Sequence, residues 1–367
     1  MKILCERNQL QEAFSVVAGI APQKTPKPIL QNVLLEASKE RVAIFATDLE
    51  ISCRVELDSV KTSKAGSALL PARQTSALLK ELTDSTVSLQ CKEMRTTLES
   101  GAGSFVLVGD DPAQFPNEVE IKDGTSFTMP GSQFLTLVRK TVFAAAREES
   151  RYMINGVLLD FHDECLRLVA TDGRRLALAY QNLGDVKDLP AVKVVVPIRA
   201  LQTLARAISE HGQQDLTVTF GDNQVGFALG STLLVSQLLE CKFPEYEVVI
   251  PKAAETSVDI PKGLLEQNLR KVAVMSSGDL RMVRFNFSSS SLEMSAESSG
   301  IGRADLVMDV DVKGAGGSIS FNPDYLLDAL KVADMETVRL DMTDDSTPAK
   351  LTLGEAYSYV LMPISGS

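Results

Sequence analysis

The 367-residue sequence has little of what a catalytic site usually requires. It contains two histidines, His162 and His211, and neither falls in a metal-binding spacing such as HExxH. There is no GxxxxGK[ST] loop for nucleotide phosphates and no GxSxG turn for a nucleophilic serine. We therefore expect no catalytic residue, no bound metal and no other cofactor in this chain.

Cysteines and long apolar runs are also scarce. The five cysteines are odd in number and far apart, and none forms a CxxC pair, so they predict neither a disulfide framework nor a zinc site. Free thiols fit a reducing compartment. No apolar run reaches 18 residues, and the N-terminus becomes charged at Glu6 and Arg7, unlike a secretory signal. We expect a cytoplasmic protein without a membrane partner.

What the sequence does contain is enough apolar material for large cores. Hydrophobic residues make up 44% of the chain, and its length suggests two or three domains. The net charge of −11 argues against a protein that holds nucleic acid by bulk attraction, since such domains are usually basic. Any binding of nucleic acid would then need a local basic surface or a topological link.

A long internal repeat organises the chain. Pro71, Pro197 and Pro323 are spaced 126 residues apart, and each follows a strand-like stretch and opens a helical pattern. The phrase around Thr47-Asp48 recurs around Thr171-Asp172. An earlier apolar stripe of helical spacing also occurs three times, once in each repeat. Together these patterns predict six helices, at 6–20, 71–82, 131–147, 197–209, 261–275 and 322–335.

Runs of alternating or continuous apolar residues lie between the predicted helices. Examples are NVLLEA, RVAIFAT, GVLLDF and LTVTF, which are typical of strands. Each repeat would hold two helices and about eight short strands, which predicts an α+β fold with helices on antiparallel sheet. We place the three domains at 1–122, 123–251 and 252–367, with boundaries in polar stretches.

The charge is distributed unevenly. The six predicted helices together carry +5, which leaves −16 for the rest of a chain of net charge −11. If the six helices faced the same side of the molecule, the surface they form would be positive. It would contact DNA phosphates without recognising the base sequence. The alternative is that these are ordinary solvated helix faces with no partner.

Seven collinear phrases carry a family resemblance. They are KPILQNVLLEA, FATDLEISCRV, LLPAR, RYMINGVLL, VATDGRRLAL, KFPEYEVVIP and YVLMPI. This set resembles the bacterial DNA polymerase III beta subunit from Met1 to about Ile364. The resemblance implies a non-catalytic sliding clamp. In such a clamp, two copies join head to tail into a ring of six similar domains around duplex DNA. Helices line the hole, and short linear motifs of polymerase subunits, clamp loader and repair proteins bind a pocket.

The resemblance also implies three sets of site residues. Those facing DNA would be Lys24, Arg73, Tyr152, Met153 and Arg199. At the dimer interface, Phe105 and Leu107 of the first domain would meet Val274 and Met275 of the third. The peptide pocket would comprise Arg151, Ile154, Gly156, Thr171, Gly173, Arg174, Arg175, Leu176, Pro244, Val248, Val249, Ser346, Val360, Met362, Pro363 and Ile364. Of these, Arg151 and Arg175 would bind peptide carboxylates or carbonyls.

Two other functions fit parts of the sequence. The acidic total suits a protein-interaction scaffold of three repeats that does not bind DNA, although the basic helices oppose it. A metal-dependent nuclease would use acidic pairs such as Asp110-Asp111, Asp309 with Asp311, or Asp344-Asp345. Adjacent acids in loops are more often simply solvated.

Overall fold

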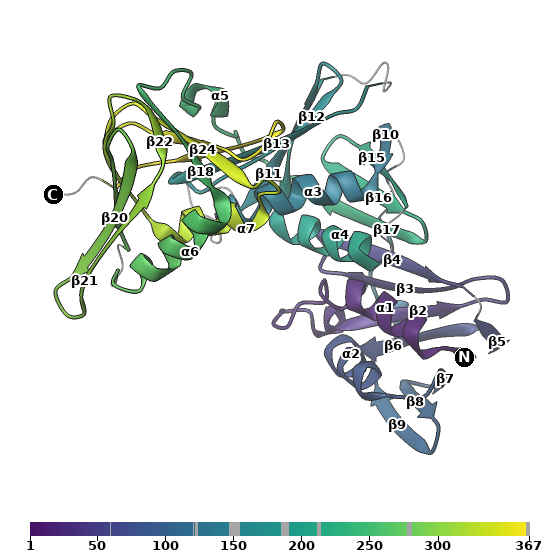
Figure 1. The fold of residues 1–367 in the computed structure, drawn as a ribbon. Coiled ribbons are helices and arrows are strands. Elements are labelled where there is room, and N and C mark those ends of the chain that lie inside the picture. The colour runs from purple at the N-terminus through teal and green to yellow at the C-terminus, as the bar shows by residue number, and fades with distance from the viewer. Residues whose placement is uncertain are drawn as a thin grey trace. The chain divides into compact units, whose positions relative to one another are not determined.

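The computed structural model describes residues 1–58, 60–119, 121, 124–146, 155–184, 191–210, 214–276 and 281–364. The chain forms two compact units, the first of residues 1–135 with 196–239 and the second of residues 136–195 with 240–367. In both units helices pack on antiparallel sheets (Figure 1), which confirms the predicted α+β class. No helix in the described ranges is long and apolar enough to cross a membrane.

Each of the six predicted helices is present. They are α1 (Arg7–Val17), α2 (Ala72–Glu81), α3 (Gly131–Thr141), α4 (Ile198–Glu210), α6 (Lys262–Ala273) and α7 (Pro323–Val332). The sequence analysis did not predict α5 (Tyr246–Val249), a single turn. Helix α3 is shorter than expected: it ends at Thr141, whose buried hydroxyl donates to the Leu137 carbonyl at 2.8 Å, and a 3-10 turn follows at Val142–Ala144.

The first unit contains two antiparallel sheets, of strand orders β5-β1-β7-β8-β9 and β10-β15-β16-β17-β4-β3-β2-β6. The strands are β1 (Lys2–Glu6), β2 (Asn32–Ala37), β3 (Val42–Thr47), β4 (Ile51–Leu57), β5 (Lys61–Lys64), β6 (Gly66–Pro71), β7 (Thr86–Lys92), β8 (Arg95–Ser100), β9 (Gly103–Val108), β10 (Thr125–Pro130), β15 (Asp215–Phe220), β16 (Gln224–Leu229) and β17 (Thr232–Gln237).

The second unit has the same plan, with sheets of order β14-β11-β12-β13-β26-β25-β24-β18-β22 and β21-β20-β19-β23. The strands are β11 (Gly156–His162), β12 (Cys165–Thr171), β13 (Arg175–Asn182), β14 (Val192–Pro197), β18 (Thr256–Pro261), β19 (Val283–Phe287), β20 (Ser291–Ser298), β21 (Gly302–Asp309), β22 (Asp311–Gly314), β23 (Gly317–Phe321), β24 (Thr337–Met342), β25 (Ala349–Thr352) and β26 (Tyr357–Leu361).

Two equivalent strand pairs join consecutive repeats into continuous sheets. In the first unit β4 pairs with β17, so that Ser52 lies opposite Val235. In the second unit β13 pairs with β26, so that Leu176 lies opposite Val360. The third pair of equivalent strands is β21 and β9, and in the described part of the chain each is the edge of its own sheet.

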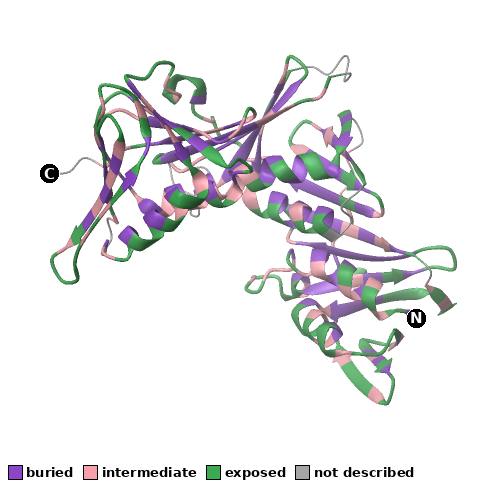
Figure 2. Ribbon diagram, in the orientation of Figure 1, coloured by how far each residue is buried: buried purple, intermediate pink, exposed green. Residues whose placement is uncertain are grey.

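The helices bury the apolar stripe that their spacing predicts. In α1, Leu10, Phe14 and Val17 are fully buried, and α1 packs on β3 and β4. Figure 2 shows buried residues along the strands and on the inner sides of the helices, with exposed residues outside. A buried Leu or Phe side chain stabilises the fold by roughly 1.5–3 kcal/mol, so these stripes hold the helices on the sheets.

Proline marks the helix starts with one difference between repeats. Pro71 and Pro197 immediately precede the first residues of α2 and α4, whereas α7 begins at Pro323 itself. There the side chain of Asn322 accepts a hydrogen bond from the Asp324 backbone N–H at 2.9 Å and caps the helix. The residue immediately before the helix is therefore Pro71 in the first repeat, Pro197 in the second and Asn322 in the third.

An arginine donates to a carbonyl at or just beyond the end of the first helix of each repeat. Arg199 donates to Ile20 at 3.3 Å, Arg175 to Phe143 at 2.9 Å, and Arg281 to Ala273 at 2.8 Å. Helix C-termini have unpaired carbonyls and a partial negative charge, which a cation stabilises. Each guanidinium also pairs with at least one aspartate: Asp48 for Arg199, Asp172 and Asp328 for Arg175, and Asp324 for Arg281.

These arginines differ in burial. The Arg175 side chain is 7% exposed, whereas that of Arg199 is 52% exposed. The Arg175 guanidinium also lies 4.4 Å from the centre of the Tyr325 ring. Burial by itself lowers the pKa of Arg175, but its neighbours Tyr359 and Asp328 raise that pKa above its ordinary value, so the side chain stays charged.

We expect Arg175→Met to lower the free energy of unfolding by about 3 kcal/mol, because it leaves carboxylates without their buried partner. Arg199→Met should cost less than about 1 kcal/mol, because solvent already screens its exposed ion pair. Urea denaturation followed by circular dichroism measures both losses. Equal losses would show that burial does not distinguish these two ion pairs.

Candidate functional site

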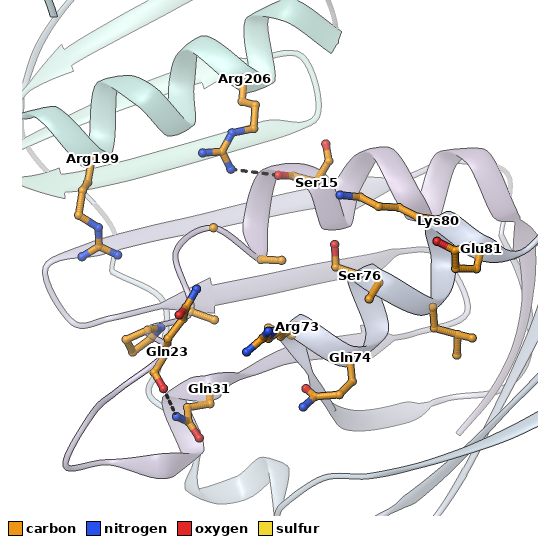
Figure 3. Close-up of a pocket in the computed structure, with 17 residues that line it drawn as sticks. Ser15, Gln23, Gln31, Arg73, Gln74, Ser76, Lys80, Glu81, Arg199 and Arg206 are labelled. Carbon is orange, nitrogen blue, oxygen red and sulfur yellow. Dashed lines mark hydrogen bonds between the residues drawn. The ribbon is translucent and has the colours of Figure 1, made fainter. Parts of the chain in front are cut away.

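A groove of about 1080 Å³ lies on the helices of the first unit (Figure 3). It is lined by residues of α1, α2 and α4 and of the turn after α1. Four of the lining residues are basic and one is acidic: Arg73, Lys80, Arg199 and Arg206, and Glu81. The groove is therefore positive although the chain as a whole is acidic.

The four cations come from equivalent positions of two repeats. Arg73 and Lys80 are seven residues apart on α2, and Arg199 and Arg206 are seven apart on α4. A separation of seven residues, two helical turns, places side chains on one face. Each residue of the first pair is 126 positions before its counterpart in the second. The sequence analysis named Arg73 and Arg199 only, and the same spacing would have found Lys80 and Arg206.

All four cations are exposed, and two of them, Arg199 and Arg206, are also hydrogen-bonded within the unit. Arg206 donates to the Ser15 carbonyl at 3.3 Å and covers Gly19, where a Cβ atom would lie 2.4 Å from its Nη1 atom. Arg199 is bound to Asp48 and Ile20, as described above. Arg73 and Lys80 are exposed and form no ion pair with any described residue. Such a surface suits contacts with phosphates that do not depend on base sequence.

Of the other residues predicted to face DNA, one lies next to the groove and two are not described. Lys24 is exposed in the turn after α1, beside Gln23, which lines the groove and accepts a hydrogen bond from Gln31 at 2.8 Å (Figure 3). Tyr152 and Met153 lie outside the described residues.

The second unit has a smaller and more apolar cleft of about 160 Å³. Its floor is the joint of β13 and β26, where Leu176 lies opposite Val360. The segment that contains α5 forms the opposite wall. The complete lining is Thr171, Gly173, Arg175, Leu176, Pro244, Tyr246, Val249, Val360 and Met362.

A tight turn shapes one end of this cleft. The hydroxyl of Thr171 donates to the Arg175 carbonyl at 2.7 Å, and the Arg175 N–H donates to Asp172 at 3.0 Å. Gly173 has a φ of +80°, which favours glycine, and no atom lies within 4 Å of the place where its Cβ would be. The cleft therefore stays open at this position.

The first unit repeats this turn without an equivalent cleft. The hydroxyl of Thr47 donates to the Ile51 carbonyl at 3.0 Å, and the Ile51 N–H donates to Asp48 at 2.7 Å. Leu49, at φ +81°, takes the place of Gly173. The cavity beside it measures only about 10 Å³, so the two turns share a backbone but not a binding space.

The remaining predicted pocket residues are in varied surroundings. Gly156 is buried at the start of β11, whereas Arg174 and Val248 are exposed near the cleft. Ser346 belongs to a separate turn, and Pro363 and Ile364 follow β26. Arg151 and Ile154 lie outside the described residues. The sequence analysis missed Tyr246, although it lies within the KFPEYEVVIP phrase.

Arg175 lines the cleft, but its charge is already paired within the protein. Its guanidinium is committed to Asp172, Asp328 and the Phe143 carbonyl. A ligand in this cleft would therefore meet mainly aliphatic and aromatic surface, with the edge of a charged group that is already paired.

Asp344, of the acidic pair Asp344-Asp345, has a structural explanation. One carboxylate oxygen of Asp344 accepts hydrogen bonds from the backbone N–H groups of Ser346 and Thr347 at 2.8 and 2.7 Å. These bonds, with the Ser346 hydroxyl, lower the pKa of Asp344 to about 2. No group of three His, Cys, Asp or Glu residues in the described part of the chain is arranged to hold a metal ion.

Of the four apolar positions predicted for a dimer interface, two are exposed and two are half-buried. On β9, Phe105 is 37% exposed, its neighbour Val106 is 57% exposed, and Leu107 is half-buried. Just after α6, Val274 is 66% exposed and Met275 is half-buried. Exposed apolar side chains on and near sheet edges are typical of surfaces that another chain covers.

Comparison with known proteins gives consistent matches over the chain. Three family models match in order: the N-terminal domain of the DNA polymerase III beta subunit at residues 1–119, its central domain at 128–245 and its C-terminal domain at 247–365. The beta sliding clamp of Chlamydia muridarum is 31% identical over 99% of both chains. That of Escherichia coli K12 is 30% identical over 99% of this chain and all of its own.

Solved structures agree with these matches. The DNA polymerase III beta subunit of Pseudomonas aeruginosa has a TM-score of 0.91 and 27% identity, and the sliding clamp of Bacillus subtilis has 0.92 and 26%, each over 100% of both chains. A further structure is a sliding clamp from Pseudomonas aeruginosa bound to griselimycin, with a TM-score of 0.91 and 28% identity. The chain therefore belongs to the DNA polymerase III beta subunit family, the beta sliding clamps.

Proposed function

We propose that two copies of this sliding clamp join head to tail into a ring around duplex DNA and tether DNA polymerase there. The chain is an accessory subunit and does not catalyse a reaction itself. The observation that carries the ring is the pair of equivalent strand joints within the chain, β4 with β17 and β13 with β26. We propose three domains, at 1–122, 123–251 and 252–367, acting in the cytoplasm.

The third equivalent joint requires a second copy. Strands β21 and β9 correspond to the strands that pair at the other two joints, and each is a sheet edge in the described chain. Both present exposed apolar side chains, Val307 at 64% and Val108 at 59%. Pairing β21 of one copy with β9 of the next repeats the internal joint, and a second such contact closes a circle. Phe105, Leu107, Val274 and Met275 would then pack together there.

Contacts with DNA in this proposal are weak and do not depend on sequence. Arg73, Lys80, Arg199 and Arg206 present a positive groove to phosphates, with Lys24 nearby and Tyr152 and Met153 as further candidates. The net charge of −11 limits bulk attraction. Enclosure retains DNA without tight binding, so that the ring can slide.

The cleft of the second unit serves as the docking site for partners. Its aliphatic and aromatic lining suits a leucine or phenylalanine anchor of a short linear peptide. We propose that polymerase subunits, clamp loader and repair enzymes present such peptides in turn. The remaining predicted pocket residues, including Arg151, Arg174, Val248 and Ile364, would contact the parts of a peptide outside the cleft.

Topological enclosure is tested with a nicked circular plasmid and the cell's ATP-driven clamp loader. We expect the protein to co-elute with circular DNA in gel filtration at moderate salt and to be lost once the DNA is cut a single time. A protein held only by direct contacts with DNA would be retained equally on the circular and the linear plasmid, because free DNA ends far from its binding site do not affect those contacts. Equal retention on both forms would contradict the ring, and no retention with an active loader would favour a scaffold that does not bind DNA.

The interface is tested with Val274→Asp. Burying an unpaired carboxylate at the contact should weaken dimerisation by about 100-fold or more. Light scattering coupled to gel filtration measures the mass. Val248→Asp is the matched control, because Val248 is a 75% exposed valine of the same unit that we place outside the interface. A Val274→Asp protein that keeps the dimer mass would rule out this interface.

The docking site is tested with Met362→Asp, which puts a charge in the apolar cleft. We expect affinity for a fluorescein-labelled peptide containing a Leu-Phe pair to fall by about tenfold or more, because an apolar anchor would face a carboxylate. Met335→Asp is the control, since Met335 is 43% exposed, against 44% for Met362, and does not line the cleft. Unchanged peptide binding by Met362→Asp would refute the assignment of the cleft.

A further inference from the structure

One wall of the cleft is a segment with very little burial. Residues 238–255, all of which are described, connect β17 to β18 and contain one short helix, α5. Tyr246 is the only buried residue among them, at 3% exposure. Pro244 and Val249, close to it in sequence, line the cleft but are exposed. A segment with so few buried side chains depends on its anchor for a defined position.

The anchor is a buried hydrogen bond between distant parts of the chain. The Tyr246 hydroxyl donates to a carboxylate oxygen of Asp160 at 2.8 Å, and Asp160 is 1% exposed on β11. Burial raises the pKa of Tyr246 and the bond to Asp160 raises it further, so the phenol keeps the proton that it donates. A hydrogen bond to a charged acceptor in such a place is stronger than one between neutral groups.

Asp160 is itself contacted by His162 of its own strand β11 and by Lys193 of β14. His162 Nδ1 lies 2.9 Å from its other oxygen, and Lys193 Nζ lies 3.4 Å from the oxygen that Tyr246 contacts. The Lys193 ammonium also lies 5.7 Å from the centre of the Tyr246 ring. These contacts compensate the buried carboxylate and hold its oxygens in place, so Tyr246 meets a rigid acceptor.

We propose that Tyr246 and Asp160 are positioning residues for partner recognition, whose hydrogen bond holds the Pro244–Val249 wall at the distance from β13 and β26 that a peptide anchor requires. This inference rests on the proposed peptide-binding function of the cleft. A wall held in place before binding spares the ligand the entropic cost of ordering it.

The test removes only the hydroxyl, with Tyr246→Phe. We expect affinity for the fluorescein-labelled Leu-Phe peptide to fall about tenfold, through faster dissociation, because the unanchored wall must be ordered on binding. Hydrogen exchange should become faster in residues 240–250 and stay unchanged in β13 and β26. Tyr180→Phe is the matched control, because the Tyr180 hydroxyl donates to the Glu355 carbonyl at 2.6 Å in the same unit and does not line the cleft.

A second variant separates anchoring from general loss of structure. Asp160→Asn keeps the shape and one carbonyl acceptor for the tyrosine, so it should weaken peptide binding by less than Tyr246→Phe and leave exchange in β13 and β26 unchanged. Faster exchange throughout the second unit in both variants would overturn the positioning role. Normal peptide affinity together with normal exchange in Tyr246→Phe would overturn it as well.

The two proposals fail in different ways. If the unmodified protein does not bind the peptide, the docking function is wrong, and the exchange data for residues 240–250 still decide whether the hydrogen bond holds the wall. If the unmodified protein binds and only Met362→Asp loses affinity, the docking function stands and the positioning role is wrong.

Discussion

Backbone pairing between consecutive repeats is the constraint on which the rest of this structure depends. At β4 with β17 and at β13 with β26, a strand from one repeat completes the sheet of the next. Separating either pair would expose two rows of buried N–H and C=O groups, which is costly. The apolar cleft is a product of one such joint, because Leu176 and Val360 lie opposite each other there and both line it. Neither repeat could form the cleft alone.

The repeats share a backbone plan and differ in the side chains at equivalent places. The turn at Thr171 carries Gly173 and borders an open cleft, whereas the same turn at Thr47 carries Leu49 and borders almost none. The carbonyls at the end of each first helix are bound by an arginine that comes from a different position in each repeat. The electrostatic requirement at a helix end is thus the same each time, while the arginine that meets it stands at a different place in the chain.

The charged side chains at equivalent helix positions also differ between repeats. Basic side chains occur at two matching positions of α2 and α4, whereas α7 has Lys331 at one of them and Asp324, which pairs with Arg281, at the other. The positive groove of the first unit therefore exists on a chain of net charge −11. This distribution suits a protein that surrounds a polyanion and must move along it, because strong general attraction would slow sliding.

The sequence by itself determined the elements and their repetition. Apolar spacing predicted six helices that the structure contains, and the recurring phrases predicted the α+β repeat, because these signals depend on neighbours within a few turns. Only the tertiary structure showed that the Arg175 guanidinium is fully engaged, that the cations on α2 and α4 line one groove, and that the Tyr246 hydroxyl donates to Asp160. Arg175 and Asp328 are 153 residues apart and Tyr246 and Asp160 are 86 apart. No local pattern encodes such contacts, since they arise only when folding brings a strand and a distant helix together.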